Sequence, residues 1–187
     1  MADDEPFSGL RLGLPEIAAH HRDVVSSLTL YFSNASPFFE IRFAGYKTVE
    51  VSDELQIRLD EVDMTSSLAV LAAVEAAFRI DYEYRCEERK KGAISQAFRE
   101  LYKDRQRRVA LDDILDVWAE KSFEDWAENS SRPRSLIGEL RGAFNFRHWL
   151  AHGRYWTPKL GRRYNFEDVF ELAQSALVSF PIYSVDN

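Results

Sequence analysis

The segment 65–91, TSSLAVLAAVEAAFRIDYEYRCEERKK, joins Ser and Thr residues at its start to an alanine- and leucine-rich body and to cationic residues near its end. Ser and Thr are preferred helix caps, alanine and leucine favour helix, and cations stabilise the C-terminal end of a helix. The segment therefore predicts one long helix, which we expect to be the central and most buried element. Gly92 interrupts it.

Outward from this helix, further segments repeat apolar residues with helical spacing. Asp112 and Asp113 stand in the first turn of one of them, and Asn165 is a candidate cap for the last. Two polar segments, NSSRPRS at 129–135 and GRYWTPKLGRR at 153–163, predict loops. The further predicted helices cover 15–33, 93–108, 111–128, 135–152 and 165–180.

Residues 37–51 and 55–64 instead alternate apolar and polar residues with period two, and Ala44-Gly45 breaks the alternation. Period two is typical of strands, and a break at glycine is typical of a turn. We predict a β-hairpin or small meander over 38–63, inserted between the first two helices. The predicted fold class is mainly α: one helical bundle domain over 1–187, with this β insertion and an N-terminal tail at 1–14.

The composition limits the class of protein. The chain has 187 residues, of which 45% are hydrophobic and 13% aromatic, and this suits one globular domain. No apolar run approaches the roughly 18 residues that span a bilayer, and the acidic start MADDEPFSG lacks the features of a secretory signal. Cys86 is the only cysteine, which excludes an internal disulfide and a thiolate metal cluster. We expect a soluble, cytoplasmic protein that does not contact membranes.

Charge is distributed unevenly along the chain. The formal net charge is −7, and residues 1–84 hold 6 Lys/Arg against 15 Asp/Glu. Residues 147–163, in contrast, hold 5 Lys/Arg and no carboxylate. A cationic stretch in an acidic protein indicates a local site for an anion.

That stretch overlaps the segment 144–156, FNFRHWLAHGRYW, in which Gly153 ends the helix that begins near Ser135. On a helical wheel Arg147 lies on one border of the apolar stripe, and His148 and His152 lie on the other. Arg147 and His152 are about 7.5 Å apart along the axis, a span that long side chains can close around one phosphate. The pattern therefore predicts a cleft with a phosphate-sized site.

Each of these residues also has a purely structural interpretation. His152 can favour the negative end of the helix dipole, and His148 can sit at the edge of the core. Arg147 can pair with a bundle carboxylate such as Glu75, which can instead pair with Arg79 at i+4 or hold a histidine. The two histidines also have the i, i+4 spacing of zinc ligands, but no third ligand is evident. We therefore predict neither a metal nor a cofactor.

With these features the sequence resembles the HEPN superfamily, whose ribonucleases carry an Arg, a polar residue, three further residues and a His near the end of a bundle helix. Here the motif reads Arg147-His148-Trp149-Leu150-Ala151-His152. The resemblance covers 15–35 and 65–181. It implies an antiparallel HEPN-like bundle with metal-independent endoribonuclease activity, in a toxin–antitoxin or phage-defence system. It also implies a homodimer with a composite active site, and a possible antitoxin or nucleotidyltransferase partner.

Two positions depart from the family pattern. His148 stands where Asn or Asp is common, and Tyr155 lies three residues after the histidine, whereas some family toxins carry a modified Tyr two residues after it. The resemblance supplies no function for the insertion at 38–63.

Cleavage of RNA without a metal needs a base for the 2′-OH proton, an acid for the leaving 5′-oxygen and a cation for the charge on the phosphorane. Imidazole can serve as base or acid, and guanidinium suits the third task. We predict His152 as acid/base and Arg147 as phosphate clamp, while His148 either orients the substrate or supplies the second proton-transfer group. Glu75 and Tyr155 are predicted supporting residues.

RNA is thus the predicted partner, and DNA is not expected. The predicted contacts are cations that follow the backbone and aromatic rings that stack on a base or pack against the protein. The alternative function is a non-catalytic helical module that binds a protein or nucleotide partner. The predicted RNA-binding residues are Arg154, Lys159, Arg162 and Arg163 for the backbone, with Trp156 or Tyr155 for stacking.

Overall fold

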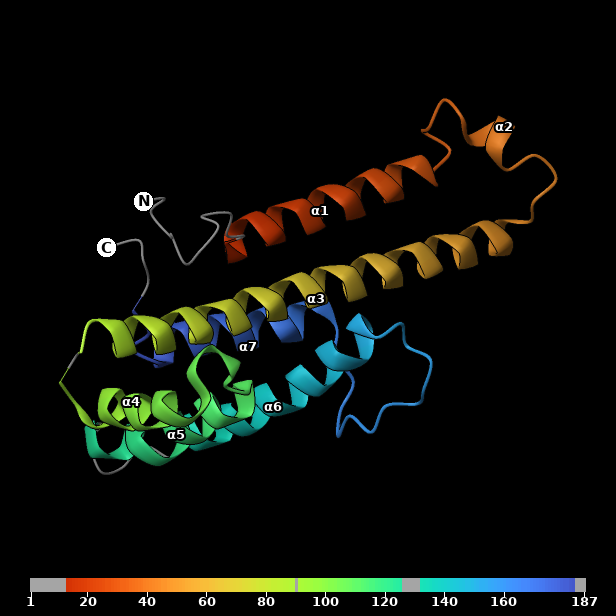
Figure 1. Ribbon diagram of the computed structural model, residues 1–187. Coiled ribbons are helices and arrows are strands. Elements are labelled where there is room, and N and C mark those ends of the chain that lie inside the picture. The colour runs from red at the N-terminus through yellow and green to blue at the C-terminus, as the bar shows by residue number, and fades with distance from the viewer. Residues whose placement is uncertain (1–12, 90, 126–131, 184–187) are drawn as a thin grey trace, which may run out of the picture.

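A computed structural model describes residues 13–89, 91–125 and 132–183. Within these ranges the regular secondary structure is entirely helical, which confirms the mainly α prediction (Figure 1). No helix in the described ranges has the length and apolarity needed to cross a membrane. The elements are α1 (Leu14–Tyr31), α2 (Phe39–Arg42), α3 (Thr48–Glu87), α4 (Ala93–Arg105), the 3₁₀ helix η1 (Gln106–Arg108), α5 (Leu111–Asp125), α6 (Arg132–Ala151) and α7 (Phe166–Ser179).

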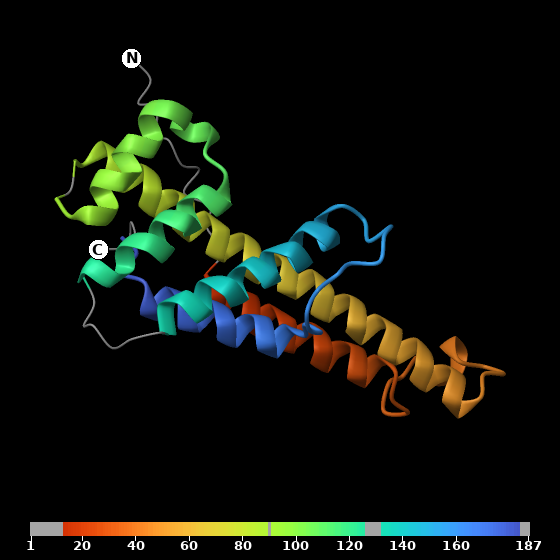
Figure 2. The ribbon, with the colours of Figure 1, turned by 90° about the horizontal axis from the view of Figure 1, so that it is seen from below.

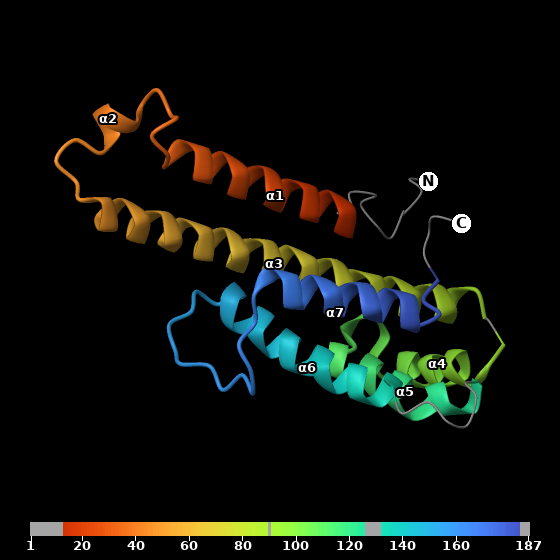
Figure 3. The same ribbon diagram turned by 180° about the vertical axis from the view of Figure 1, so that it is seen from behind.

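Helix α3 is the spine of the molecule. Its 40 residues span about 60 Å, and it contacts α1, α4, α5, α6 and α7. Figures 1 and 3 show α1 and α6 running opposite to α3 and α7, and Figure 2 shows α6 crossing α3. The prediction of a central, buried helix is confirmed, because four side chains along its middle are completely buried: Val70, Leu71, Val74 and Phe78.

The β insertion predicted at 38–63 is wrong. Residues 48–63 are the first four turns of α3, and Phe39–Arg42 form the single turn α2. The helix begins where the Glu50 carboxylate accepts the Lys47 N–H at 2.7 Å. Thr65, expected near a helix start, lies inside the helix and donates its hydroxyl to the Glu61 carbonyl at 2.9 Å.

As a result, α1 and α3 form a long antiparallel hairpin whose end projects beyond the other helices (Figures 1 and 2). A small separate apolar cluster holds this end together. Phe32, Phe43 and Val51 are buried there, and Phe39 packs against them.

A buried ion pair ties the C-terminal segment to the opposite end of the spine. Arg85 Nε donates to the Asp81 carboxylate at 2.8 Å, and its terminal nitrogens donate to the Ser95 hydroxyl at 3.3 Å and the Pro181 carbonyl at 2.6 Å. The Tyr183 N–H donates to Asp81 at 2.9 Å. Burial raises the pKa of Asp81, and Arg85 opposes that shift. These contacts join α3, α4 and the residues after α7.

The remaining helix boundaries agree with the sequence patterns to within a few residues. Asn165 caps α7 by accepting the Asp168 N–H at 2.7 Å. Helix α6 begins at Arg132, three residues before the predicted start, so residues 132–135 of the predicted loop are helical. Residues 126–131, and the first twelve residues of the predicted N-terminal tail, lie outside the described ranges.

Candidate functional site

The C-terminal end of α6 stops through the backbone. Gly153 adopts φ 80° and Arg154 φ 59°. The Arg154 N–H donates to the Trp149 carbonyl at 3.2 Å and the Gly153 N–H to the Leu150 carbonyl at 3.4 Å, the paired bonds of a Schellman motif. Because glycine adopts positive φ without strain, this position fixes where the helix ends. His152 is therefore the last residue whose direction the helix sets.

Arg147 is held from the neighbouring helix. Its terminal nitrogen lies 3.0 Å from the Glu75 carboxylate on α3, and the same carboxylate accepts Arg79 Nε at 2.8 Å. Both arginines considered as partners for Glu75 are thus bound at once. The Glu75 side chain is only 16% exposed, so it acts as a fixed anchor between two arginines.

The guanidinium of Arg147 is incompletely satisfied. Its Nε is buried and has no hydrogen-bond acceptor among the described residues. A buried polar group without a partner costs about 1–3 kcal/mol, and in a native structure each such group calls for an explanation. The Arg147 side chain as a whole is 33% exposed, so part of it remains accessible to a ligand.

Arg147 also forms part of the wall of a hollow of about 340 Å³. The hollow lies where α3, the start of α5 and the second half of α6 meet. We call it the α5–α6 hollow. It is lined by Glu75, Ala110, Leu111, Asp112, Arg141, Phe144, Asn145, Arg147 and His148.

The charges around the α5–α6 hollow are largely paired. Arg141 forms ion pairs with Asp116 and, at 3.9 Å, with Asp112. The first turn of α5 faces the hollow, and the Asp113 carboxylate accepts the Ala110 N–H at 3.2 Å. A helix N-terminus carries partial positive charge, and the first-turn carboxylates of Asp112 and Asp113 already face it here.

The two histidines stand side by side at the rim. Their ring centroids are 4.3 Å apart, and the ring of Trp156 lies 5.9 Å from that of His148. Both histidines are exposed to solvent. His148 lines the α5–α6 hollow together with Arg147, whereas His152 lies one turn beyond it. The order along the surface is therefore Arg147, His148 and His152.

The connection between α6 and α7, residues 152–165, is fastened back onto the bundle. Trp149 Nε1 donates to the Trp156 carbonyl at 2.7 Å. Arg154 donates to the Glu61 carboxylate on α3 at 2.7 and 3.1 Å, so its charge is paired within the protein. Tyr155, in contrast, is 84% exposed beside Trp156.

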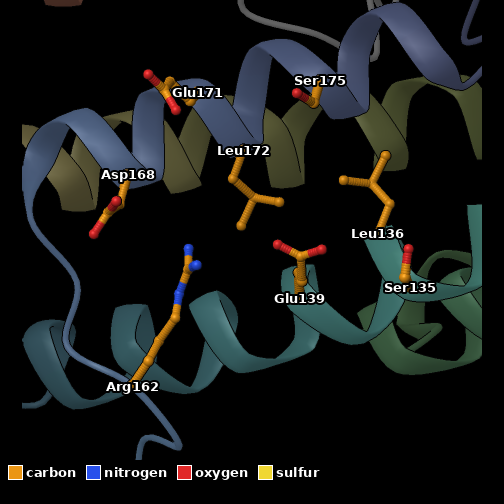
Figure 4. Close-up of a pocket in the computed structure, with 8 residues that line it drawn as sticks. All are labelled: Ser135, Leu136, Glu139, Arg162, Asp168, Glu171, Leu172 and Ser175. Carbon is orange, nitrogen blue, oxygen red and sulfur yellow. The ribbon is translucent and has the colours of Figure 1, made fainter. Parts of the chain in front are cut away.

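Arg162 points away from this region. Figure 4 shows it reaching between α6 and α7 toward Asp168, into a second hollow of about 220 Å³ that Glu139 and Glu171 also line. Its guanidinium lies 4.9 Å from the ring of Tyr164. The second hollow shares no lining residue with the α5–α6 hollow. Arg154 and Arg162 thus each face partners within the protein. Lys159 and Arg163 are exposed, and among the described residues no such contact is found for either.

Sequence reasoning predicted a cleft beside Arg147 and His148 but missed the other walls of the α5–α6 hollow. Arg141, Asn145 and the first turn of α5 enter the site only because α5 packs against α6, and no spacing within either segment indicates that contact. Among the described residues no group of three or more His, Cys, Asp or Glu side chains is placed to hold a metal ion.

Comparison of the chain with protein-family models, with curated proteins and with solved structures found no match. The roles assigned to Arg147, His148 and His152 therefore stay predictions, founded on the motif and on the geometry around it.

Proposed function

We propose that this protein is a metal-independent endoribonuclease of the HEPN kind. One observation carries the proposal: Arg147, anchored by Glu75, shares the wall of the α5–α6 hollow with His148, whose ring touches that of His152. A cation and two imidazoles within one nucleotide's reach are the groups that metal-free RNA cleavage needs.

In the proposed reaction His152 takes the proton of the 2′-OH, and the 2′-oxygen attacks the adjacent phosphorus. Arg147 neutralises the charge that develops on the phosphorane oxygens. His148 then gives a proton to the 5′-oxygen as its bond to phosphorus breaks. The products are a 2′,3′-cyclic phosphate and a 5′-hydroxyl.

The proposal includes a homodimer in which the two motifs face one another. The exposure of His148 and His152 supports it, because both imidazoles are open to a second chain. A toxin or defence role, restrained by an antitoxin or a nucleotidyltransferase, belongs to the same proposal. Growth arrest on expression of the wild-type chain, absent with Arg147→Ala, is the expected cellular result.

The direct test is cleavage of RNA by the purified protein in excess EDTA. We expect Arg147→Ala and His152→Ala each to lower the rate about 100-fold or more. His20→Ala and Arg58→Ala are matched controls, because both residues are exposed on α1 and α3, outside the α5–α6 hollow. Absence of cleavage of every RNA tried, with folding shown by circular dichroism, would count against the proposal.

A second function, binding of a partner without catalysis, is favoured by the end of the α1–α3 hairpin. Most of the exposed large apolar side chains of the described residues gather there, and contiguous apolar surface often marks an interaction site. This function is supported if His152→Ala lowers the melting temperature yet leaves RNA binding and cellular toxicity unchanged. The exposed apolar residues at this end are Leu30, Tyr31, Phe38, Ile41, Tyr46, Val49 and Ile57.

A further inference from the structure

We infer that the α5–α6 hollow receives one unstacked nucleobase of a single-stranded RNA, next to the phosphate that is cleaved. This inference rests on the proposed function and deepens it by naming the form of the substrate. It assigns a binding role to residues outside the motif, chiefly Ala110, Leu111, Phe144 and Asn145.

The size of the hollow fits a single nucleotide. Its volume of about 340 Å³ is near the lower end of the range for small-molecule sites, which run from roughly 300 to 1,000 Å³. A base inside a duplex is stacked on both faces and cannot enter a pocket of this size without being extruded. A base in a single strand enters such a pocket at a lower cost, because no base pair is broken.

The walls have the chemistry of a base site. Leu111 and the half-buried Phe144 supply apolar surface from α5 and α6, against which the flat face of a base can pack. Asn145 offers both a donor and an acceptor at the open edge. Asp112, whose side chain is 79% exposed, adds an acceptor there. Apolar faces with a polar edge match the shape of a nucleobase.

The position of the hollow links the base to the reaction. Arg147 and His148 line the same hollow, so a base within it places its own phosphate beside both side chains. The strand then continues past His148 toward Trp156, whose ring is 5.9 Å away, and the exposed Tyr155. One base in the hollow and the next on this aromatic pair would hold the strand across the scissile bond.

The test measures binding of a strand that cannot be cleaved. The probe is a fluorescein-labelled hexanucleotide of mixed sequence with 2′-fluoro in place of every 2′-OH, read by fluorescence anisotropy. It is compared with its blunt duplex and with a strand of the same length that is abasic throughout. We expect the intact single strand to bind at least about 10-fold more tightly than either, because each stacked base contributes roughly that factor.

The deciding variant is Ala110→Trp, which fills the hollow from an exposed position. It should weaken binding of the intact strand about 10-fold and leave binding of the abasic strand unchanged. Ala44→Trp, which adds the same side chain at an exposed alanine in the α2–α3 connection, should change neither. If Ala110→Trp does not fold, Asn145→Trp fills the same hollow from α6.

Two failures are distinguishable. Equal binding of the intact and abasic strands, or wild-type binding by Ala110→Trp, overturns the base site while cleavage in EDTA still upholds the endoribonuclease. Absence of binding to every strand by the wild-type chain overturns both.

Discussion

At the scale of single residues, Arg147 shares its carboxylate partner, Glu75, with a second arginine and leaves one of its own hydrogen-bond donors, the buried Nε, without an acceptor among the described residues. An arginine kept only for stability would be expected to satisfy its donors. The contact with Glu75 holds this cation from α3, and Arg147 also lines the α5–α6 hollow.

Cys86 gives a prediction that depends on pH. Burial raises the pKa of its thiol to about 11, from 9.0 for an ordinary cysteine. At pH 8 the native chain should then hold about 100-fold less thiolate than an ordinary cysteine and react correspondingly slowly with iodoacetamide, since the thiolate is the nucleophile. The rate should rise about tenfold per pH unit between pH 7 and 10. Equal alkylation rates in the native and urea-unfolded chain would contradict this account.

Gly142 and Gly138 form a matched pair on α6. A Cβ at Gly142 would lie 2.6 Å from the Tyr164 hydroxyl, and the Tyr164 ring stacks on Phe146 at 5.2 Å, so it has little freedom to move. We expect Gly142→Ala to lower the free energy of unfolding by about 1–3 kcal/mol. Nothing lies within 4 Å of a Cβ at Gly138, so Gly138→Ala should raise it by about 0.4–1 kcal/mol. Urea unfolding of the two variants measures the difference, and equal stabilisation by both would refute the contact.

At the scale of elements, α3 shows what the sequence could and could not predict. Val51 and Leu55 lie one helical turn apart and pack in the cluster that includes Leu28 of α1. The exposed Val49 and Ile57 add the alternate apolar positions that mimic a strand. The period-two pattern thus arose from apolar side chains that the fold leaves in solvent. Burial is a property of the packed molecule, so the segment alone could not reveal it.

The other helices were predictable because capping residues and the spacing of apolar residues can be read within one segment of sequence. Asn165 and Gly153 act where their residue types indicate. A cleft beside Arg147 and His148 was predicted from α6 alone, but the wall that α5 contributes was not, since it depends on how the two helices pack together. The same holds for Arg154, which sequence reasoning assigned to RNA and which pairs with Glu61, 93 residues away.

Ile57 tests the helical assignment of the hairpin end. Its side chain is 66% exposed in the interior of α3. Proline there removes a helical hydrogen bond and clashes with the preceding turn, so Ile57→Pro should cost about 3 kcal/mol and lower the ellipticity at 222 nm. Ile57→Ala, which favours helix at the same exposed site, should leave both unchanged or slightly raised. Unaltered helical content in Ile57→Pro would contradict a continuous α3.

At the scale of the whole molecule, the two ends of α3 are held by different contacts: a small apolar cluster at the hairpin end and a buried ion pair at the other. The Asp81–Arg85 pair joins α3 to α4 and to the chain after α7, and it closes the bundle far from the hairpin end. The candidate site lies between these ends, at the crossing of α6 over α3 (Figure 2).

Loss of this buried pair should affect the entire bundle. Arg85→Ala leaves the Asp81 carboxylate buried without its cation, which should cost about 3–5 kcal/mol. Arg58→Ala removes an exposed i, i+4 pair with Glu54 on the same helix and should cost less than about 0.5 kcal/mol. Thermal unfolding measures both, and similar melting temperatures for the two variants would show that the Asp81–Arg85 pair does not stabilise the bundle.

The central claim, RNA cleavage by Arg147, His148 and His152 through attack of the 2′-oxygen, is tested most directly by removing one oxygen atom from the substrate. After a cleavage position is mapped in EDTA, the same RNA is made with a single 2′-deoxy nucleotide on the 5′ side of that bond. We predict that cleavage at this bond is lost while other cleaved bonds remain, and that products of the unmodified RNA end in a 2′,3′-cyclic phosphate. Cleavage that persists at the 2′-deoxy position would contradict the account.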